Sequence, residues 1–270
     1  MTKAKVLFVL GTPFCGSTVF ARALTDQDRT FNLGEIDRVS QLGENLFPLQ
    51  ETLCDCCDLL RQDCPIFTNS FVSDLRRATK PSALYDVIEK QTGAQTILDT
   101  SKHANWYRKM MADPDVANRA KAILLVRHPA SYIASFARHN PHLAGFGAFV
   151  AGAENWRNTY TDLMRTVMTN GASFIIQRLD HFRSDPVRVS GQVAEFVGIK
   201  TLLTDNMITT GLSHAIGGNP NANAAFANKN YEINPSDRGQ RDSEINRAIR
   251  YAYGVGDLAT NVFGFDLDND

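Results

Sequence analysis

The chain has 270 residues, of which 43% are hydrophobic and 21% are charged, a composition typical of a soluble globular protein. Its 28 lysines and arginines balance 29 aspartates and glutamates, so we expect neither nucleic acid nor an anionic lipid surface as a partner. No apolar run approaches the roughly 20 residues of a membrane span, and no targeting segment is evident. We therefore expect a cytoplasmic protein with a single domain over residues 1–270.

The first predicted unit is a strand, a glycine-containing turn and a helix. Residues 5–10 (KVLFVL) form a short apolar run that is typical of a buried strand. Gly11 and Gly16 enclose a turn, and a helix is expected from Ser17 to about residue 24. The glycine spacing is that of a phosphate-binding loop, but Ser17 replaces the lysine of nucleotide triphosphatases, which disfavours a triphosphate substrate. A plain tight turn is the alternative interpretation of this motif alone.

Residues 34–80 do not continue this pattern, and we expect an insertion of short helices and loops beside the sheet. The insertion contains a group of cysteines, namely Cys54, Cys56, Cys57 and Cys64. Such a group is compatible with a zinc site, with local disulfides or with reduced thiols. Because the spacing C-x-C-C-x6-C matches no standard zinc pattern, the sequence predicts no metal.

Strands and helices alternate over the rest of the chain. Further strands are predicted at residues 96–99, 122–126 and 173–177, and helices at about 105–111, 130–139, 149–168 and 187–197. This alternation predicts an α/β fold, with a parallel sheet flanked by helices on both faces and a ligand beyond the carboxyl ends of the strands. Residues 211–240 are rich in asparagine, and we expect a long loop there.

A second phosphate-binding motif follows the strand at residues 122–126. Arg127 comes directly after this strand, and Ser135 lies in the next predicted helix. A guanidinium group and a hydroxyl group are together suited to hold one terminal phosphate. A surface arginine is the alternative interpretation. Two separate phosphate sites suggest a nucleotide that bears two separate phosphates.

Together these segments resemble the sulfotransferases that use 3′-phosphoadenosine 5′-phosphosulfate (PAPS). LGTPFCGSTVFARAL is similar to the family's 5′-phosphosulfate loop, and VRHPASYIASFARH to its 3′-phosphate motif. The segments NLGE, LDTSK and HAIGGNP agree in order along the chain. The resemblance implies a P-loop NTPase-like sulfotransferase fold, PAPS as co-substrate without a metal, and sulfuryl transfer to a hydroxyl or amine of a small-molecule, carbohydrate or lipid acceptor.

The resemblance also implies which residues form the donor site. Family members usually carry a lysine or arginine where Phe14 stands, so Lys102 is expected to supply the missing cation at the sulfate. The residues expected to bind the donor are Phe14, Cys15, Gly16, Ser17, Thr18, Arg127, Ser135 and Asn219.

A general base must remove the proton of the acceptor, and three residues are candidates. Glu35 is the first choice because its Gly-Glu setting resembles that of a catalytic glutamate in the family. His103 and His214 are the alternatives. Two rival functions remain open at this point: a catalytically impaired nucleotide-binding homologue, which Phe14 would suit, and a P-loop kinase, which the missing loop lysine disfavours.

Overall fold

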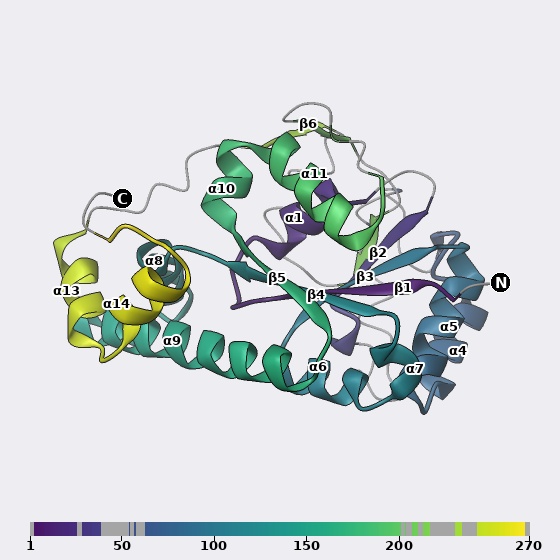
Figure 1. Ribbon diagram of the computed structural model, residues 1–270, viewed down its shortest axis with the longest axis horizontal. Helices are drawn as coiled ribbons and strands as arrows, with labels where there is room; N and C mark the ends of the chain where they lie inside the picture. Colours follow the sequence, from purple (N-terminus) through teal and green to yellow (C-terminus); the bar gives the residue numbers. More distant parts are fainter. Residues whose placement is uncertain are drawn as a thin grey trace.

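A six-stranded parallel sheet occupies the centre of the part of the chain that the structure, a computed structural model, describes (Figure 1). The described residues are 3–25, 29–38, 54, 57, 63–200, 203, 207–209, 213–216, 230–233 and 242–267. The strand order is β5-β4-β1-β3-β2-β7. The strands are β1 (Lys5–Leu10), β2 (Thr30–Gly34), β3 (Thr96–Lys102), β4 (Ala120–Val126), β5 (Ser173–Arg178) and β7 (Ser213–Ile216).

Strand β1 lies in the middle of the sheet, between β3 and β4. Lys5 pairs with Thr96 of β3, and Val6 pairs with Ala120 of β4. After β1 the chain places β2 and β3 on one side of it and β4 and β5 on the other, so the order of the strands reverses around β1. In parallel sheets, ligands bind at such a reversal, beyond the carboxyl ends of the strands.

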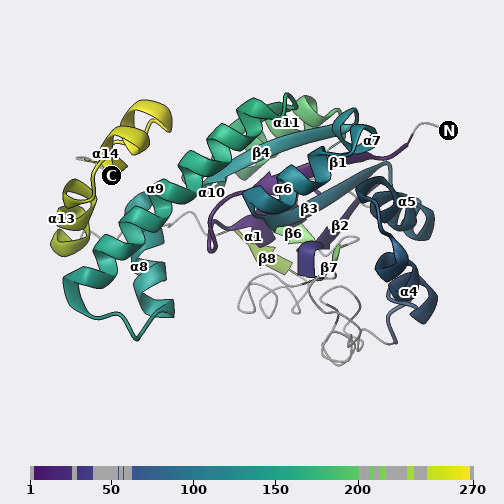
Figure 2. The same ribbon diagram turned by 90° about the horizontal axis from the view of Figure 1, so that it is seen from below.

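Helices cover both faces of the sheet, as Figure 2 shows. Leu7 and Val9 of β1 pack toward one face, in a buried cluster with α1 (Ser17–Ala23), α10 (Leu179–Ser184) and α11 (Pro186–Val197). Phe8, which is fully buried, packs toward the other face and is worth roughly 2–3 kcal/mol of burial. The helices of that face are α4 (Asn69–Arg77), α5 (Pro81–Thr92), α6 (Ala104–Met111), α7 (Pro114–Ala117), α8 (Pro129–His139), α9 (Gly145–Thr169), α13 (Ser243–Tyr251) and α14 (Val255–Asp257).

Two smaller features complete the description of the fold. Strands β6 (Met207–Thr209) and β8 (Asn230–Glu232) form a separate antiparallel pair, and a short π-helix (Leu258–Val262) follows α14. Within the described ranges, no helix combines the length and the hydrophobicity that crossing a membrane requires.

The predicted α/β class and the parallel sheet are confirmed. The strand predicted at residues 96–99 continues to Lys102, and the long helix predicted from residue 149 begins at Gly145. Strand β2 and helix α5 were not predicted. The prediction of a loop over residues 211–240 is wrong for Ser213–Ile216, because these residues pair with β2 and form the edge of the sheet. It is also wrong for Asn230–Glu232, which pair with β6.

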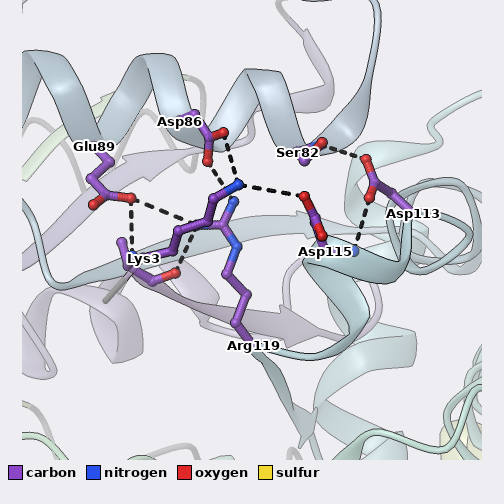
Figure 3. A network of polar contacts seen from close by, with 8 residues as sticks. Lys3, Ser82, Asp86, Glu89, Asp113, Asp115 and Arg119 are labelled. Carbon is purple, nitrogen blue, oxygen red and sulfur yellow. Dashed lines mark hydrogen bonds and ion pairs between the residues drawn. The ribbon is translucent and has the colours of Figure 1, made fainter. Parts of the chain in front are cut away.

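A network of ion pairs holds the amino end of the sheet to α5 and α7 (Figure 3). Arg119, just before β4, donates to the carbonyl of Ala4 and to Asp86, each at 2.9 Å. Lys3 pairs with Asp86 at 3.1 Å and with Asp115 at 3.5 Å. Because this network lies at the amino ends of the strands, it is remote from the carboxyl ends, where the sequence places the ligand.

Candidate functional site

The loop between β1 and α1 turns sharply into the helix. Phe14 and Gly16 have left-handed backbone conformations, with φ of 64° and 83°. Gly16 is required here, because a Cβ atom at this position would lie 2.7 Å from Leu179 Cδ1. Turns of this kind direct successive backbone N–H groups to one side and thereby form concave anion sites.

The side chains of this loop face different environments. Cys15 is fully buried, and its burial raises the pKa of the thiol. The Cys15 side chain therefore belongs to the core, and its backbone N–H donates to the Thr12 carbonyl at 3.2 Å within the loop. Ser17 is also buried, at 3% exposure, whereas Thr18 is partly exposed.

Arg127 connects this loop to helix α8. Its Nη1 atom donates to the Phe14 carbonyl at 2.9 Å and to the Ser135 hydroxyl at 3.0 Å. Its backbone carbonyl accepts a hydrogen bond from Trp156 Nε1 at 2.9 Å. The fold therefore brings the two predicted phosphate-binding motifs together through a single guanidinium group, whose position is set from both its side chain and its backbone.

The carboxyl ends of β2 and β3 hold a buried ion pair. These strands are neighbours, so Glu35, which follows β2, meets Lys102, the last residue of β3. The Lys102 ammonium group pairs with Glu35 Oε1, and Arg38 pairs with Glu35 Oε2. The Glu35 and Lys102 side chains are only 11% and 12% exposed.

The charge partners of Glu35 determine its ionisation. Burial by itself raises the pKa of Glu35, but Lys102 and Arg38 outweigh burial and bring the pKa below its ordinary value. Glu35 is therefore ionised at neutral pH. A carboxylate held between two cations in this way is a weak base.

The residues with left-handed backbone also mark this edge of the sheet. In the described part of the chain, Phe14 and Lys102 are the non-glycine residues with positive φ, each at 64°. Such conformations cost of order 1–3 kcal/mol and occur often at functional sites, where the surrounding structure maintains them. Phe14 lies in the loop after β1, and Lys102 is the last residue of β3, so both are at the predicted ligand edge.

A buried carboxylate below Lys102 holds the end of β3 in place. Asp99 is fully buried and accepts hydrogen bonds from Tyr85 at 2.7 Å and from Trp106 at 2.8 Å. Burial raises its pKa, although these hydrogen bonds oppose the rise. Asp99 also accepts from Ser101, whose Oγ in turn accepts the backbone N–H of Asp37 at 3.1 Å. Asp99 thereby positions the turn that carries Glu35.

Two residues at this edge were missed by the sequence reasoning. Asp37 is 6% exposed, and burial raises its pKa, although the nearby charge of His103 opposes the rise. His139 stacks on the Phe14 ring, with centroids 4.2 Å apart and planes at 25°. Asp37 follows Glu35 by two positions, and His139 follows Ser135 by four. This closeness to predicted site residues is the only feature of the sequence that could have identified them.

Of the remaining residues that the sequence singled out, His103 and His214 lie in the described part of the chain. His103 is exposed and directly precedes α6. His214 lies in β7, with its Nδ1 atom 3.2 Å from the Sγ atoms of both Cys54 and Cys64. Asn219 and Cys56 lie outside the described residues.

Solved sulfotransferase structures share this fold. A sulfotransferase domain from the Synechococcus PCC 7002 olefin synthase has a TM-score of 0.63 at 21% identity, over 94% of this chain and 96% of its own. A sulfotransferase domain from the curacin biosynthetic pathway has a TM-score of 0.58 at 18% identity, over 98% and 99%. A sulfotransferase from Mycobacterium avium has a TM-score of 0.50 at 13% identity, over 100% and 79%. Comparisons with protein-family models and with curated proteins find no match. The chain therefore has the P-loop-like sulfotransferase fold.

Proposed function

We propose that this protein is a sulfotransferase that transfers a sulfuryl group from PAPS to a hydroxyl or amine of a small-molecule, carbohydrate or lipid acceptor. The observation that carries the proposal is the contact of Arg127 with both the Phe14 carbonyl and the Ser135 hydroxyl. This contact joins two anion-binding motifs at the ligand edge of a sulfotransferase fold. A donor with separate 5′ and 3′ phosphates requires two such motifs side by side.

In this proposal the donor is held from two sides. Backbone N–H groups of residues 16–18 and the hydroxyl groups of Ser17 and Thr18 bind the 5′-phosphosulfate. Arg127 and Ser135 bind the 3′-phosphate, for which the planar guanidinium group offers paired donors. We assign Asn219 to the donor site as well, on the resemblance of its segment alone.

The reaction is an in-line displacement at sulfur. The acceptor oxygen or nitrogen forms a bond to sulfur, and the bond from sulfur to the bridging oxygen of the 5′-phosphate breaks. The electron pair of that bond leaves with adenosine 3′,5′-bisphosphate, and the acceptor proton passes to Glu35. Lys102 stabilises the charge that grows on the bridging oxygen, the role of a positioned electrostatic group.

The ion pair between Lys102 and Glu35 couples these two roles. When Lys102 turns toward the sulfate, Glu35 loses its nearest cation, and its pKa rises. The base thus becomes stronger in the donor complex, in which it is needed. His103 is the alternative base, and we propose it second because it is exposed and Glu35 is buried beside the cation.

A specific observation favours a second function, nucleotide binding without catalysis. Phe14 stands where the resembling family carries a cation, and its ring packs on His139. If Lys102 does not replace that cation, the protein binds the nucleotide but does not transfer the sulfuryl group. Product formation from PAPS, measured alongside nucleotide binding, distinguishes the two functions.

The first test is calorimetric titration with adenosine 3′,5′-bisphosphate in buffer without Mg²⁺. We expect binding that Arg127→Ala weakens about 10- to 100-fold, the effect of losing charge-assisted hydrogen bonds to a phosphate. Arg188→Ala is the matched control, because this arginine is 54% exposed and lies on α11. ATP with and without Mg²⁺ tests the kinase alternative. Absence of bisphosphate binding by folded wild-type protein would refute the donor assignment.

A further inference from the structure

Three cysteines that are close together in sequence meet a distant histidine at the edge of the sheet. Cys54, Cys57, Cys64 and His214 each offer one ligand atom, and all four atoms lie within 4.8 Å of one another. We call these four residues the Cys-His cluster. The cysteines belong to the predicted insertion, whereas His214 comes from strand β7, 150 residues beyond Cys64.

The separation of two sulfurs in the cluster matches an edge of a tetrahedral zinc site. With Zn–S bonds of about 2.3 Å and Zn–N bonds of about 2.05 Å, tetrahedral angles require S···S edges of about 3.8 Å and S···N edges of roughly 3.6 Å. Cys54 Sγ and Cys64 Sγ are 3.8 Å apart, the length of the S···S edge. Each sulfur lies 3.2 Å from His214 Nδ1, about 0.4 Å closer than the S···N edge, so binding of the ion requires a small outward shift of the imidazole. A disulfide needs sulfurs about 2.05 Å apart, so Cys54 and Cys64 are not bonded to each other, and their separation suits two ligands of one metal ion.

Burial makes ordinary hydrogen bonding a poor explanation of this arrangement. Cys54, Cys64 and His214 are at most 5% exposed. Nδ1 of an imidazole has one lone pair or one proton, so it can form one good hydrogen bond. It cannot form two good hydrogen bonds to two sulfurs at equal distance. A metal ion between the atoms satisfies all of them, and the stacking of the His214 ring on Phe31, with planes at 13°, fixes its orientation.

We propose that the Cys-His cluster binds a structural zinc ion. Three thiolates and one imidazole are a common ligand set of closed zinc sites, with no position left for a substrate. The cation joins the insertion to β7, a four-residue strand at the edge of the sheet. The Ile216 carbonyl of β7 accepts the Glu35 backbone N–H at 2.7 Å, so the ion supports the strand beside the candidate base.

The cluster also shows why the cysteine spacing was not informative. Cys54 and Cys57 are separated by two residues, which is a standard zinc spacing, but Cys56 between them obscures the pattern. The fourth ligand lies in another part of the chain, and only the pairing of β7 with β2 brings it close. In this proposal His214 is a metal ligand, and the base role that the sequence allowed for it falls away.

The test is metal analysis of the full-length, tag-free protein, purified with a non-thiol reductant and no chelator. We expect about one zinc ion per chain. Replacement with Co²⁺ is expected to produce the thiolate charge-transfer band and the strong visible bands of tetrahedral cobalt. This second readout requires no variant, so a folding failure cannot obscure it.

Variants identify the ligands. We expect Cys64→Ser and His214→Ala to bind zinc at least about tenfold more weakly. His214→Cys is expected to retain zinc, because a set of four thiolates is also common in structural sites and a cysteine sulfur has a reach similar to that of Nδ1. Cys15→Ser is the matched control, since Cys15 is equally buried but lies outside the cluster, and its zinc content is expected to equal that of the wild type.

Several results would overturn the proposal. Wild-type protein without zinc and without a cobalt spectrum refutes it, and so does a disulfide among Cys54, Cys57 and Cys64 in nonreducing peptide mapping. Equal zinc content in the wild type and in His214→Ala refutes the ligand assignment. Zinc content is independent of nucleotide binding, so failure of this proposal is distinct from failure of the proposed sulfotransferase function.

Discussion

Gly34 offers a direct test of how β2 and β7 support the site. Its φ is 79°, and a Cβ atom at this position would lie 2.5 Å from the carbonyl oxygen and 2.6 Å from the nitrogen of Ile216. These are backbone atoms of the neighbouring strand and cannot rotate away. Gly34→Ala must therefore displace β7 from β2, in addition to straining its own backbone.

The expected cost follows from two contributions. A left-handed alanine costs about 1–2 kcal/mol. Displacing β7 also breaks the hydrogen bond from the Glu35 N–H to the Ile216 carbonyl, worth about 0.5–1.5 kcal/mol, and loosens the packing around it. We expect Gly34→Ala to lower the free energy of unfolding by roughly 2–4 kcal/mol.

Gly93→Ala is the matched control for this substitution. Gly93 also has a positive φ, 69°, but its Cβ atom would meet no atom within 4 Å. Only the backbone contribution of about 1–2 kcal/mol then applies. Denaturant unfolding followed by circular dichroism measures both variants, and in thermal unfolding each kcal/mol corresponds to about 2 °C. Equal destabilisation by the two variants would refute the close approach of β7 to Gly34.

Three further predictions concern the site and the opposite end of the sheet. Lys102→Met is expected to lower kcat about a hundredfold while leaving bisphosphate affinity nearly unchanged, because the lysine acts at the sulfate; a parallel loss of affinity would contradict this role. The base must be deprotonated, and kcat/KM for PAPS reports the free enzyme, in which Lys102 and Arg38 still pair with Glu35. With Glu35 as base, kcat/KM for PAPS therefore stays flat on acidification and falls only below the ordinary glutamate value of 4.5. A fall that begins well above this value would contradict Glu35 as the base. Arg119→Met is expected to cost about 1–3 kcal/mol in denaturant unfolding, whereas Lys3→Met, at half-exposed ion pairs, changes stability little; equal effects would refute the importance of the buried guanidinium.

The parts of the site that were predictable from sequence depend on short-range patterns. The loop after β1 was recognisable because its glycines are five positions apart, next to an apolar strand. Arg127 and Ser135 were recognisable for the same reason, since one ends a strand and the other lies in the following helix. A residue at the carboxyl end of a buried strand faces the ligand edge in any parallel sheet, so such local signals were sufficient.

The strands that were missed lack such a local signal. Strand β2 (TFNLG) contains an asparagine and a glycine, which are both unfavourable in strands. It is stabilised by contacts distant in sequence, such as the hydrogen bond of 3.0 Å from Asn32 Nδ2 to Ser213 Oγ. Strand β7 has four residues and pairs with β2 at the edge of the sheet. Tertiary contacts therefore outweighed propensity in both strands.

The sequence by itself determined the α/β class, and it predicted the candidate phosphate-binding loop and the arginine and serine of the candidate second motif, because these signals each depend on residues within about ten positions of one another. Only the tertiary structure decided that Glu35 pairs with Lys102 and that His214 meets Cys54 and Cys64. Those contacts depend on strand order, and strand order is set by the packing of residues separated by tens to hundreds of positions. A local pattern carries no information about which distant strand will be its neighbour.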